Sequence, residues 1–354
     1  MPDSHRAPAG GPMAGTVFVT LPDLVANEPA MAALHDHFTA VRVVTDRGRA
    51  LAELTALGAD VTAAIVGVKE RIDAGVLAAL PELRAVGSVG TGTDHLDLTA
   101  LRDHRVGLVT APGVNAVSVA EHTMALLLGL AKRLLAGHAA VLAGTDRAGM
   151  PQRPVELRGR RAGVLGAGAT ARALLPMLRA FGLEPRVWTR NPDRHPDLPT
   201  APLEDVLLHS DVLSVHLPLA EGTRGLLTPE RLGLLPEGAL VVNTARKAVF
   251  DLPGLPALRA ARPDLRFAVD DFGLAADGTA ALLAPDGLLS PHIAGVTAES
   301  LRAMEDTAVH GTIALLRGGT ARPWGDEALP TGNNPDEDLG GPTADVGVGG
   351  GCPG

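Results

Sequence analysis

The chain has 354 residues, a length that predicts about two domains. Hydrophobic residues make up 46% of it, but aromatic residues make up 2% and tyrosine is absent, so an aromatic platform for single-stranded nucleic acid is not expected. The net charge of −9, without a dense Lys/Arg block, removes the electrostatic basis for general binding to nucleic acid or anionic membrane.

Targeting and metal-binding signals are also missing from the sequence. The single cysteine, Cys352, excludes an internal disulfide, and the histidines lack paired ligand spacing, so no metal is expected. Residues 1–14 are rich in Pro, Gly and Ala and lack the apolar core of a signal peptide, and no run reaches the ~18 apolar residues of a membrane helix. We expect a soluble, cytoplasmic protein with a disordered N-terminal tail over 1–14.

Apolar, β-branched runs alternate with helix-like stretches in the first part of the chain, which predicts an α/β fold with a mostly parallel sheet. The expected strands are 16–20, 41–45, 63–66 and 84–88, and the expected helices are 24–38, 49–57 and 73–80. A nearly continuous apolar run over 118–135, with Glu121 in its first turn, then predicts a long buried helix.

A second series of strands and helices starts with the strand 161–165 and ends near His292. A last helix over 298–317 follows, and we expect it to pack back on the first domain. The remaining residues, 325–354, are rich in Gly, Pro, Asp and Asn without apolar periodicity, which predicts a disordered tail.

A glycine-rich fingerprint lies between the strand 161–165 and a helical run over 172–181. Its sequence is Gly166-Ala167-Gly168-Ala169-Thr170-Ala171. Gly166 permits a tight turn, Gly168 lets a pyrophosphate approach the backbone, and Ala171 allows close packing of helix on strand. The helix that starts at Ala169 and Thr170 then directs its N-terminus at the phosphates. Its strand and helix context favours a dinucleotide site over a plain turn.

The end of the next strand, 185–188, bears on the choice of cofactor. An acid that binds the adenosine ribose is normal there for NAD, but this chain has Thr189, followed by Arg190 and Arg194. Cations without the acid favour the 2′-phosphate of NADP. NAD remains the alternative, with Arg190 a solvated charge.

Two strand ends carry candidate catalytic residues. Arg246 follows the apolar run 239–243, and His292 follows 288–289, positions where open α/β sheets collect ligands. An arginine holds a carboxylate with its planar fork and polarises a carbonyl, and a histidine exchanges protons near neutral pH. The structural alternatives are a surface cation for Arg246 and a cap of the helix region near Glu299 for His292.

With these residues included, about 15–323 resembles the D-2-hydroxyacid dehydrogenase family, which includes phosphoglycerate dehydrogenase, glyoxylate/hydroxypyruvate reductases and phosphite dehydrogenase. Besides the glycine fingerprint, the motifs that carry the resemblance are Gly90-Thr91-Gly92-Thr93-Asp94-His95-Leu96-Asp97, Pro112-Gly113-Val114-Asn115, Val119-Ala120-Glu121-His122-Thr123, His216-Leu217-Pro218-Leu219, Asn243-Thr244-Ala245-Arg246 and Ser290-Pro291-His292.

The resemblance implies two Rossmann-like domains with parallel sheets. A discontinuous substrate-binding domain would comprise 15–114 and 297–324, and a central dinucleotide-binding domain would comprise 115–296. The cleft between them would close on substrate. Family members are usually dimers held by the cofactor domain, so the resemblance implies a homodimer with 119–150 as a contact.

Individual roles are implied as well. The amides of Val89 and Gly90 would bind the substrate carboxylate with Arg246, and Asp270 would hold the nicotinamide amide. Further cofactor contacts are implied for Thr123, His216, Pro218, Thr244 and Ala245.

The chain departs from the family pattern at two positions. The family glutamate that pairs with the catalytic histidine is replaced by Ala275, and Asp277 could substitute only if the loop is rearranged. Losing this carboxylate would slow ketone reduction more than oxidation, which suggests an unusual substrate or a bias toward oxidation. Lys247 stands where the family has Gly after the Arg, and it either points into solvent or binds the second charge of a dianionic substrate.

The sequence therefore predicts an NADP- or NAD-dependent oxidoreductase acting on a small anionic 2-hydroxy acid or related hydroxy compound. Oxidation of a small phosphonate or phosphorus oxyacid is an alternative within the enzyme class. A catalytically weak dinucleotide-binding sensor, similar to a corepressor, is the alternative from another class. The presence of both Arg246 and His292 favours the enzyme, because a sensor has no evident need for either.

Overall fold

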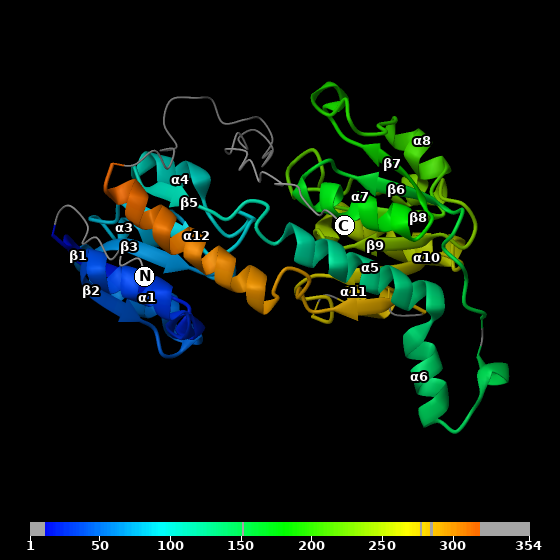
Figure 1. The fold of residues 1–354 in the computed structure, drawn as a ribbon, viewed down its shortest axis with the longest axis horizontal. Helices are drawn as coiled ribbons and strands as arrows, with labels where there is room; N and C mark the ends of the chain where they lie inside the picture. Colours follow the sequence, from blue (N-terminus) through cyan, green and yellow to red (C-terminus); the bar gives the residue numbers. More distant parts are fainter. Residues whose placement is uncertain (1–10, 151, 277, 284–285, 319–354) are drawn as a thin grey trace, which may run out of the picture.

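The computed structural model describes residues 11–150, 152–276, 278–283 and 286–318, which form two α/β domains side by side (Figure 1). This confirms the predicted fold class. The first sheet has five parallel strands in the order β2-β1-β3-β4-β5. They are β1 (Met13–Val19), β2 (Phe38–Val43), β3 (Val61–Val66), β4 (Ala85–Ser88) and β5 (Gly107–Val109).

The helices of the first domain come from both ends of the described chain. They are α1 (Glu28–His37), α2 (Ala50–Leu57), α3 (Ala74–Ala78), α4 (Leu98–Asp103) and α12 (Ala298–Leu316), with 3₁₀ turns at Pro22–Ala26, Arg47–Arg49 and Gly58–Asp60. Strand β1 begins at Met13, within the range 1–14 for which a tail is predicted. Residues 1–10 and the predicted tail 325–354 lie outside the described residues.

Helix α12 packs against the first sheet, as expected for the last helix. Val309 and Ile313 of α12 share a buried cluster with Val17 and Val19 of β1. A side chain at Gly87 of β4 would bring a Cβ within 2.4 Å of the Thr312 Oγ1 atom. Glycine therefore lets helix and strand approach this closely.

The second sheet has six parallel strands in the order β11-β10-β9-β8-β6-β7. They are β6 (Arg161–Leu165), β7 (Glu184–Trp188), β8 (Val212–Val215), β9 (Leu240–Asn243), β10 (Arg266–Asp270) and β11 (Leu288–Ser290). The chain reverses direction across the sheet between β6 and β8, which places a ligand crevice at the carboxyl ends of these strands.

Both faces of this sheet are covered, which explains why its strands read as continuous apolar runs. Its helices are α5 (Ala116–Lys132), α6 (Leu134–Leu142), α7 (Ala169–Ala180), α8 (Leu203–Leu208), α9 (Pro229–Gly233), α10 (Leu255–Ala261) and α11 (Thr279–Leu283), with 3₁₀ turns at Arg147–Gly149, Pro192–Arg194, Lys247–Val249 and Leu252–Gly254.

The long helix expected over 118–135 ends earlier than predicted. Arg133 adopts a left-handed conformation (φ 54°, ψ 42°), and the axes of α5 and α6 differ by 57° at this residue. The Arg133 side chain is buried, and its guanidinium donates hydrogen bonds to the side chains of Gln152 and Asp286. The predicted helix is therefore interrupted at Arg133, where this side chain forms contacts with residues distant in the sequence.

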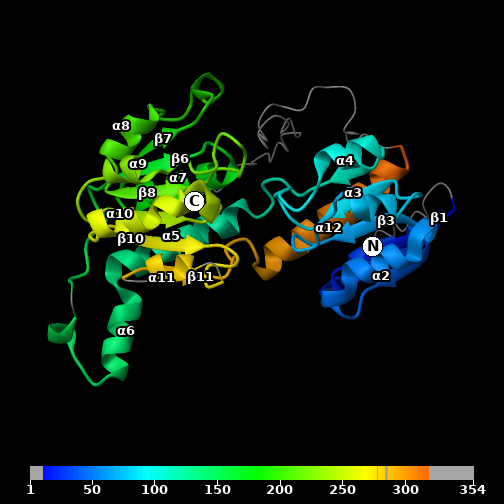
Figure 2. The ribbon, with the colours of Figure 1, turned by 180° about the vertical axis from the view of Figure 1, so that it is seen from behind.

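Helix α6 projects from the rest of the second domain (Figures 1 and 2). Its apolar residues Leu134, Leu135, Val141 and Leu142 are 58–75% exposed. Of the described helices, none is by itself long and apolar enough to cross a membrane, and only the bent pair α5 and α6 together meets that length and composition.

Candidate active site

Arg246 and His292 follow strands β9 and β11, which lie on either side of β10. All three strands are parallel, so the two residues emerge at the same edge of the sheet. The Asn243 side chain fixes the turn that leads to Arg246, because its amide donates to the Arg246 carbonyl at 2.9 Å and its oxygen accepts from the Ala245 amide at 2.9 Å.

The loop that carries His292 is held by Asp270 at the end of β10. His292 has a left-handed backbone (φ 58°), which is unfavourable for a residue with a Cβ. The Asp270 carboxylate accepts hydrogen bonds from the Ser290 hydroxyl (2.6 Å) and from the amides of Ile293 (2.9 Å) and Ala294 (2.8 Å). Asp270 is 2% exposed, and these hydrogen bonds to the loop after β11 hold the loop in place.

Two neighbours fix the His292 ring. The Nδ1 atom lies 3.3 Å from the Asp271 Oδ1 atom, and the Phe272 ring stacks on the imidazole with centroids 4.1 Å apart. Helix α12 is capped by Thr297 with Ser300, so His292 is not its cap.

Asp271 is a buried carboxylate that also accepts hydrogen bonds from the amides of Lys247 and Phe272. Burial alone would raise the pKa of Asp271. The hydrogen bonds from His292 and the two amides, with the charge of Arg246, outweigh burial and hold this pKa below its ordinary value. Asp271 is therefore ionised at neutral pH.

Asp277, the carboxylate that the sequence suggests as a substitute for the family glutamate, lies outside the described residues, and Ala275 has no carboxylate. The sequence signal for Asp271 is the pair of acidic residues, Asp270 and Asp271, at the end of a strand. Side chains of neighbouring residues point to opposite sides of a strand, so the two carboxylates can have different partners.

Arg246 reaches across to the first domain. Its Nε atom donates to Asp94 at 2.6 Å and its Nη1 atom donates to the Ala245 carbonyl at 2.9 Å. Its Nη2 atom would be 2.7 Å from a Cβ built on Gly92. Gly92 and Asp94 belong to the loop after β4, so the guanidinium lies between the two domains.

The amides of this loop differ in their availability. Val89 donates to the Val66 carbonyl at 2.8 Å and Gly90 to the Ser88 carbonyl at 2.9 Å, so both amides predicted to bind substrate are already engaged. Within the described residues, the amides of Thr91 and Gly92 have no hydrogen-bond partner. The available donors beside Arg246 therefore come one or two residues later than expected.

Two lysines lie near Phe272. The Lys69 ammonium, on the loop after β3, is 5.6 Å from the Phe272 ring centroid. The Lys247 ammonium would lie 3.3 Å from a Cβ built on Gly273, next to Phe272, and Lys247 is only partly exposed. Lys247 thus lies along the loop that carries Asp271 and Phe272.

The fingerprint has the features that a pyrophosphate needs. Gly166 has φ 109°, and a Cβ there would come within 2.5 Å of the His216 carbonyl oxygen, so the turn requires glycine. Helix α7 follows with Gly168 as N-cap and no side-chain cap, which leaves the amides at Ala169 and Thr170 for an anion. These residues fit the phosphates of a dinucleotide.

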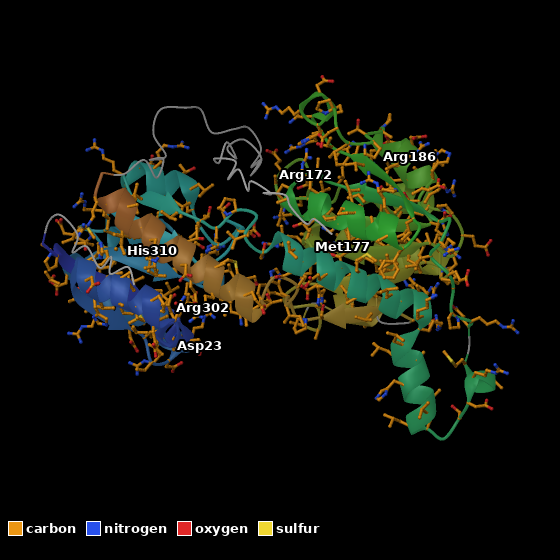
Figure 3. The ribbon with its side chains drawn as sticks, viewed as in Figure 1. Asp23, Arg172, Met177, Arg186, Arg302 and His310 are labelled. Atoms are coloured by element: carbon orange, nitrogen blue, oxygen red, sulfur yellow. The ribbon has the colours of Figure 1, made fainter. Side chains whose placement is uncertain are left out.

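Two arginines bear on the expected adenosine end of the cofactor site. The Arg190 Nη1 atom would lie 3.5 Å from a Cβ built on Gly222, on the loop that follows β8. Arg172 of α7, labelled in Figure 3, pairs with Asp197 at 2.6 Å. Thr189, whose hydroxyl accepts from the Asn191 amide at 3.4 Å, directly follows β7 where an acid is normal for NAD.

The remaining predicted cofactor residues lie around the ends of β8 and β9. The hydroxyls of Thr123 and Thr244 are 3.0 Å apart, which joins α5 to the loop that leads through Ala245. The His216 Nε2 atom is 2.8 Å from the Ser214 hydroxyl, and burial lowers the pKa of His216 to about 4. Pro218 accepts a hydrogen bond from the Thr223 hydroxyl. Where the chain is described, no group of three potential metal ligands occurs.

Comparison with known proteins identifies the family to which this chain is similar. The model of the D-isomer specific 2-hydroxyacid dehydrogenase NAD-binding domain matches residues 124–294. An (S)-sulfolactate dehydrogenase from Chromohalobacter salexigens is 35% identical over 272 residues, which is 73% of this chain and 84% of the relative. An erythronate-4-phosphate dehydrogenase from Azotobacter vinelandii is 34% identical over 280 residues, which is 76% of this chain and 66% of the relative.

A solved structure has a similar fold. The TT0316 protein from Thermus thermophilus superposes with a TM-score of 0.73 at 30% identity, covering 86% of this chain and 97% of that protein.

Proposed function

The chain belongs to the D-isomer specific 2-hydroxyacid dehydrogenase family, and from this premise we propose that its substrate is a 2-hydroxy acid with a second anionic group and that it prefers NADP over NAD. It is an oxidoreductase that transfers a hydride between a nicotinamide cofactor and a small anionic hydroxy acid. The observation that carries this function is the convergence of Arg246 and His292 at the ends of β9 and β11, on either side of β10 and opposite the loop after β4.

The residues of the site have roles that follow from their surroundings. When bound, the nicotinamide supplies or accepts the hydride. The Arg246 guanidinium and the amides of Thr91 and Gly92 bind the substrate carboxylate, and the charge of Arg246 polarises the carbonyl. The His292 Nδ1 atom faces Asp271, so its Nε2 atom gives a proton to the substrate oxygen in reduction and takes it in oxidation.

The preference for NADP rests on the end of β7. Thr189 replaces the acid that would repel a 2′-phosphate, and Arg190 lies over Gly222 beside it. We expect kcat/KM with NADP to exceed that with NAD for the same substrate. An equal or larger value with NAD would contradict this part of the proposal.

Lys69 and Lys247 favour a second anionic group on the substrate, because their ammonium groups lie beside Phe272 and the adjacent Gly273. Phe272 stacks on His292, so both cations lie near the reacting centre. Sulfolactate and erythronate 4-phosphate, named for two relatives, each carry a carboxylate and a second acid group.

Replacing Lys69 by alanine should therefore discriminate between substrate classes. Loss of a charged hydrogen bond should raise KM about 10- to 100-fold for a dianionic hydroxy acid, with little effect on a monoanionic one such as glycolate. Lys132→Ala is the matched control, because Lys132 on α5 donates to the Val155 carbonyl away from the cleft. A Lys69→Ala enzyme with unchanged KM for every dianion would contradict the proposed substrate class.

Turnover is the decisive test of the enzyme itself. Absorbance of the nicotinamide would be followed in both directions with 2-hydroxy acids, 2-keto acids, sulfonates, phosphate esters and small phosphonates. Activity abolished by His292→Ala supports the dehydrogenase. Tight cofactor binding without turnover across the panel would favour the dinucleotide-binding sensor.

A homodimer through α5 and α6 is the assembly that we propose. Its support is the row of exposed apolar side chains on α6, a helix none of whose residues is buried in the single chain.

A further inference from the structure

Asp271 is the buried carboxylate beside the His292 ring, at a position next to Asp270 at the end of β10. We infer that Asp271 is the positioning residue that orients His292 and stabilises its protonated form, in place of the family glutamate that Ala275 replaces. The inference rests on the proposed function, since it assigns a group that acts through the proton-transferring histidine.

The position of Asp271 is fixed independently of the histidine. Its two carboxylate oxygens accept hydrogen bonds from the amides of Lys247 and Phe272, and its side chain is 7% exposed. An ionised carboxylate only accepts hydrogen bonds, so the His292 Nδ1 atom must carry the proton that it shares with Asp271. The stacked Phe272 ring fixes the plane of the imidazole. The Nε2 atom is left for the substrate.

The other nearby carboxylates have different partners. Asp270 holds the backbone amides after His292, and Asp94 pairs with Arg246. In the described part of the chain, Asp271 is the only carboxylate within 4.0 Å of the His292 ring nitrogens. Two neighbouring residues at the end of β10 therefore have different roles: Asp270 holds the loop and Asp271 holds the ring.

Asp271 also ties the two catalytic loops together. Its hydrogen bond to the Lys247 amide immobilises the residue after Arg246, while its other oxygen faces His292. One carboxylate thus sets the spacing between the group that binds the substrate carboxylate and the group that transfers the proton.

The test is Asp271→Asn, which keeps the size of the side chain and an oxygen acceptor but removes the charge. Rates would be measured in both directions over a wide pH range. Reduction needs the protonated histidine, which the carboxylate stabilises, so kcat for reduction should fall about 100-fold near neutral pH, and its decline with rising pH should begin at lower pH. Oxidation at alkaline pH should lose much less. Asp103→Asn, at an exposed position on α4, is the matched control and should behave as wild type.

Three outcomes would overturn the inference. The first is an Asp271→Asn enzyme with an unchanged pH profile. The second is an equal loss of rate at every pH and in both directions, which indicates a structural role alone. The third is a shifted profile in Asp277→Asn combined with an unshifted one in Asp271→Asn, which would assign the role to Asp277.

A measurement on the unmodified protein covers the case in which Asp271→Asn does not fold. In ¹⁵N-histidine NMR, with His292 assigned by comparison with His292→Asn, neutral His292 should carry its proton on Nδ1. A proton on Nε2 would contradict the inference. Absence of wild-type turnover across the panel would count against the proposed function instead, and this NMR test would remain valid.

Discussion

At the scale of single residues, two histidines are kept neutral by their surroundings. Burial lowers the pKa of His95 to about 4, against the opposing charges of Asp94 and Glu70, and it lowers the pKa of His216 to about 4 as well. Each ring contacts a serine hydroxyl, Ser88 for His95 and Ser214 for His216. Neither ring gains a carboxylate hydrogen bond of the kind that His292 makes.

These two histidines should make the protein less stable in mild acid. Their folded pKa lies below the ordinary value near 6.5, so the unfolded chain takes up protons first as pH falls, and stability is lost between about pH 6.5 and 4. We expect His95→Gln to remove about 1 to 2 kcal/mol of the difference in unfolding free energy between pH 7 and 4.5. Urea unfolding at both pH values measures this, and an unchanged difference in the variant would contradict it.

The residue types of the site could be predicted from the sequence, but the hydrogen-bond partners of these residues could not. Arg246, His292 and Gly166 are recognisable because a strand end or a turn leaves few residue types able to serve there. Asp271 could not be predicted as a partner of His292, because the side to which its carboxylate points depends on the twist of β10 and on the loop that follows it. Likewise, which amides after β4 are free depends on where the sheet's hydrogen bonding stops.

At the scale of elements, the turn between β6 and α7 depends on one glycine. Gly166→Ala places a methyl group against the His216 carbonyl in an unfavourable backbone conformation. We expect the unfolding free energy to fall by about 1–3 kcal/mol, with weakened NADPH binding. Gly233→Ala on α9, where a Cβ meets nothing within 4 Å, is the control and should be neutral or slightly stabilising. Thermal unfolding and NADPH fluorescence measure both effects, and equal behaviour of the two variants would contradict the prediction.

Element boundaries were predictable where the apolar pattern is local. Most strands of both sheets are short runs rich in apolar residues, and α12 closely matches the expected 298–317. The break at Arg133 was not predictable, because 118–135 is apolar throughout and the partners of Arg133, Gln152 and Asp286, are distant in sequence.

At the scale of the whole molecule, the exposed face of α6 makes the oligomeric state testable. Burying an acidic side chain in an apolar interface without a partner is costly, so Val141→Glu and Leu142→Glu should weaken dimerisation about 100-fold or more. Val25→Glu, at a valine 55% exposed on the first domain, is the control. Sedimentation velocity over a concentration series gives the answer. A monomeric wild-type protein, or variants that dimerise as well as wild type, would contradict the proposed interface.

The path of the chain through the two domains has a consequence for its synthesis. The ribosome makes β1 to β5 first, but the helix that covers one face of their sheet, α12, follows only after the complete second domain. The second domain is continuous, so it can fold as soon as it has been made. The nascent first domain must meanwhile keep the face around Gly87 uncovered, and an exposed apolar face is prone to aggregation. Chaperones that act on nascent chains would therefore be needed most during the interval between β5 and α12.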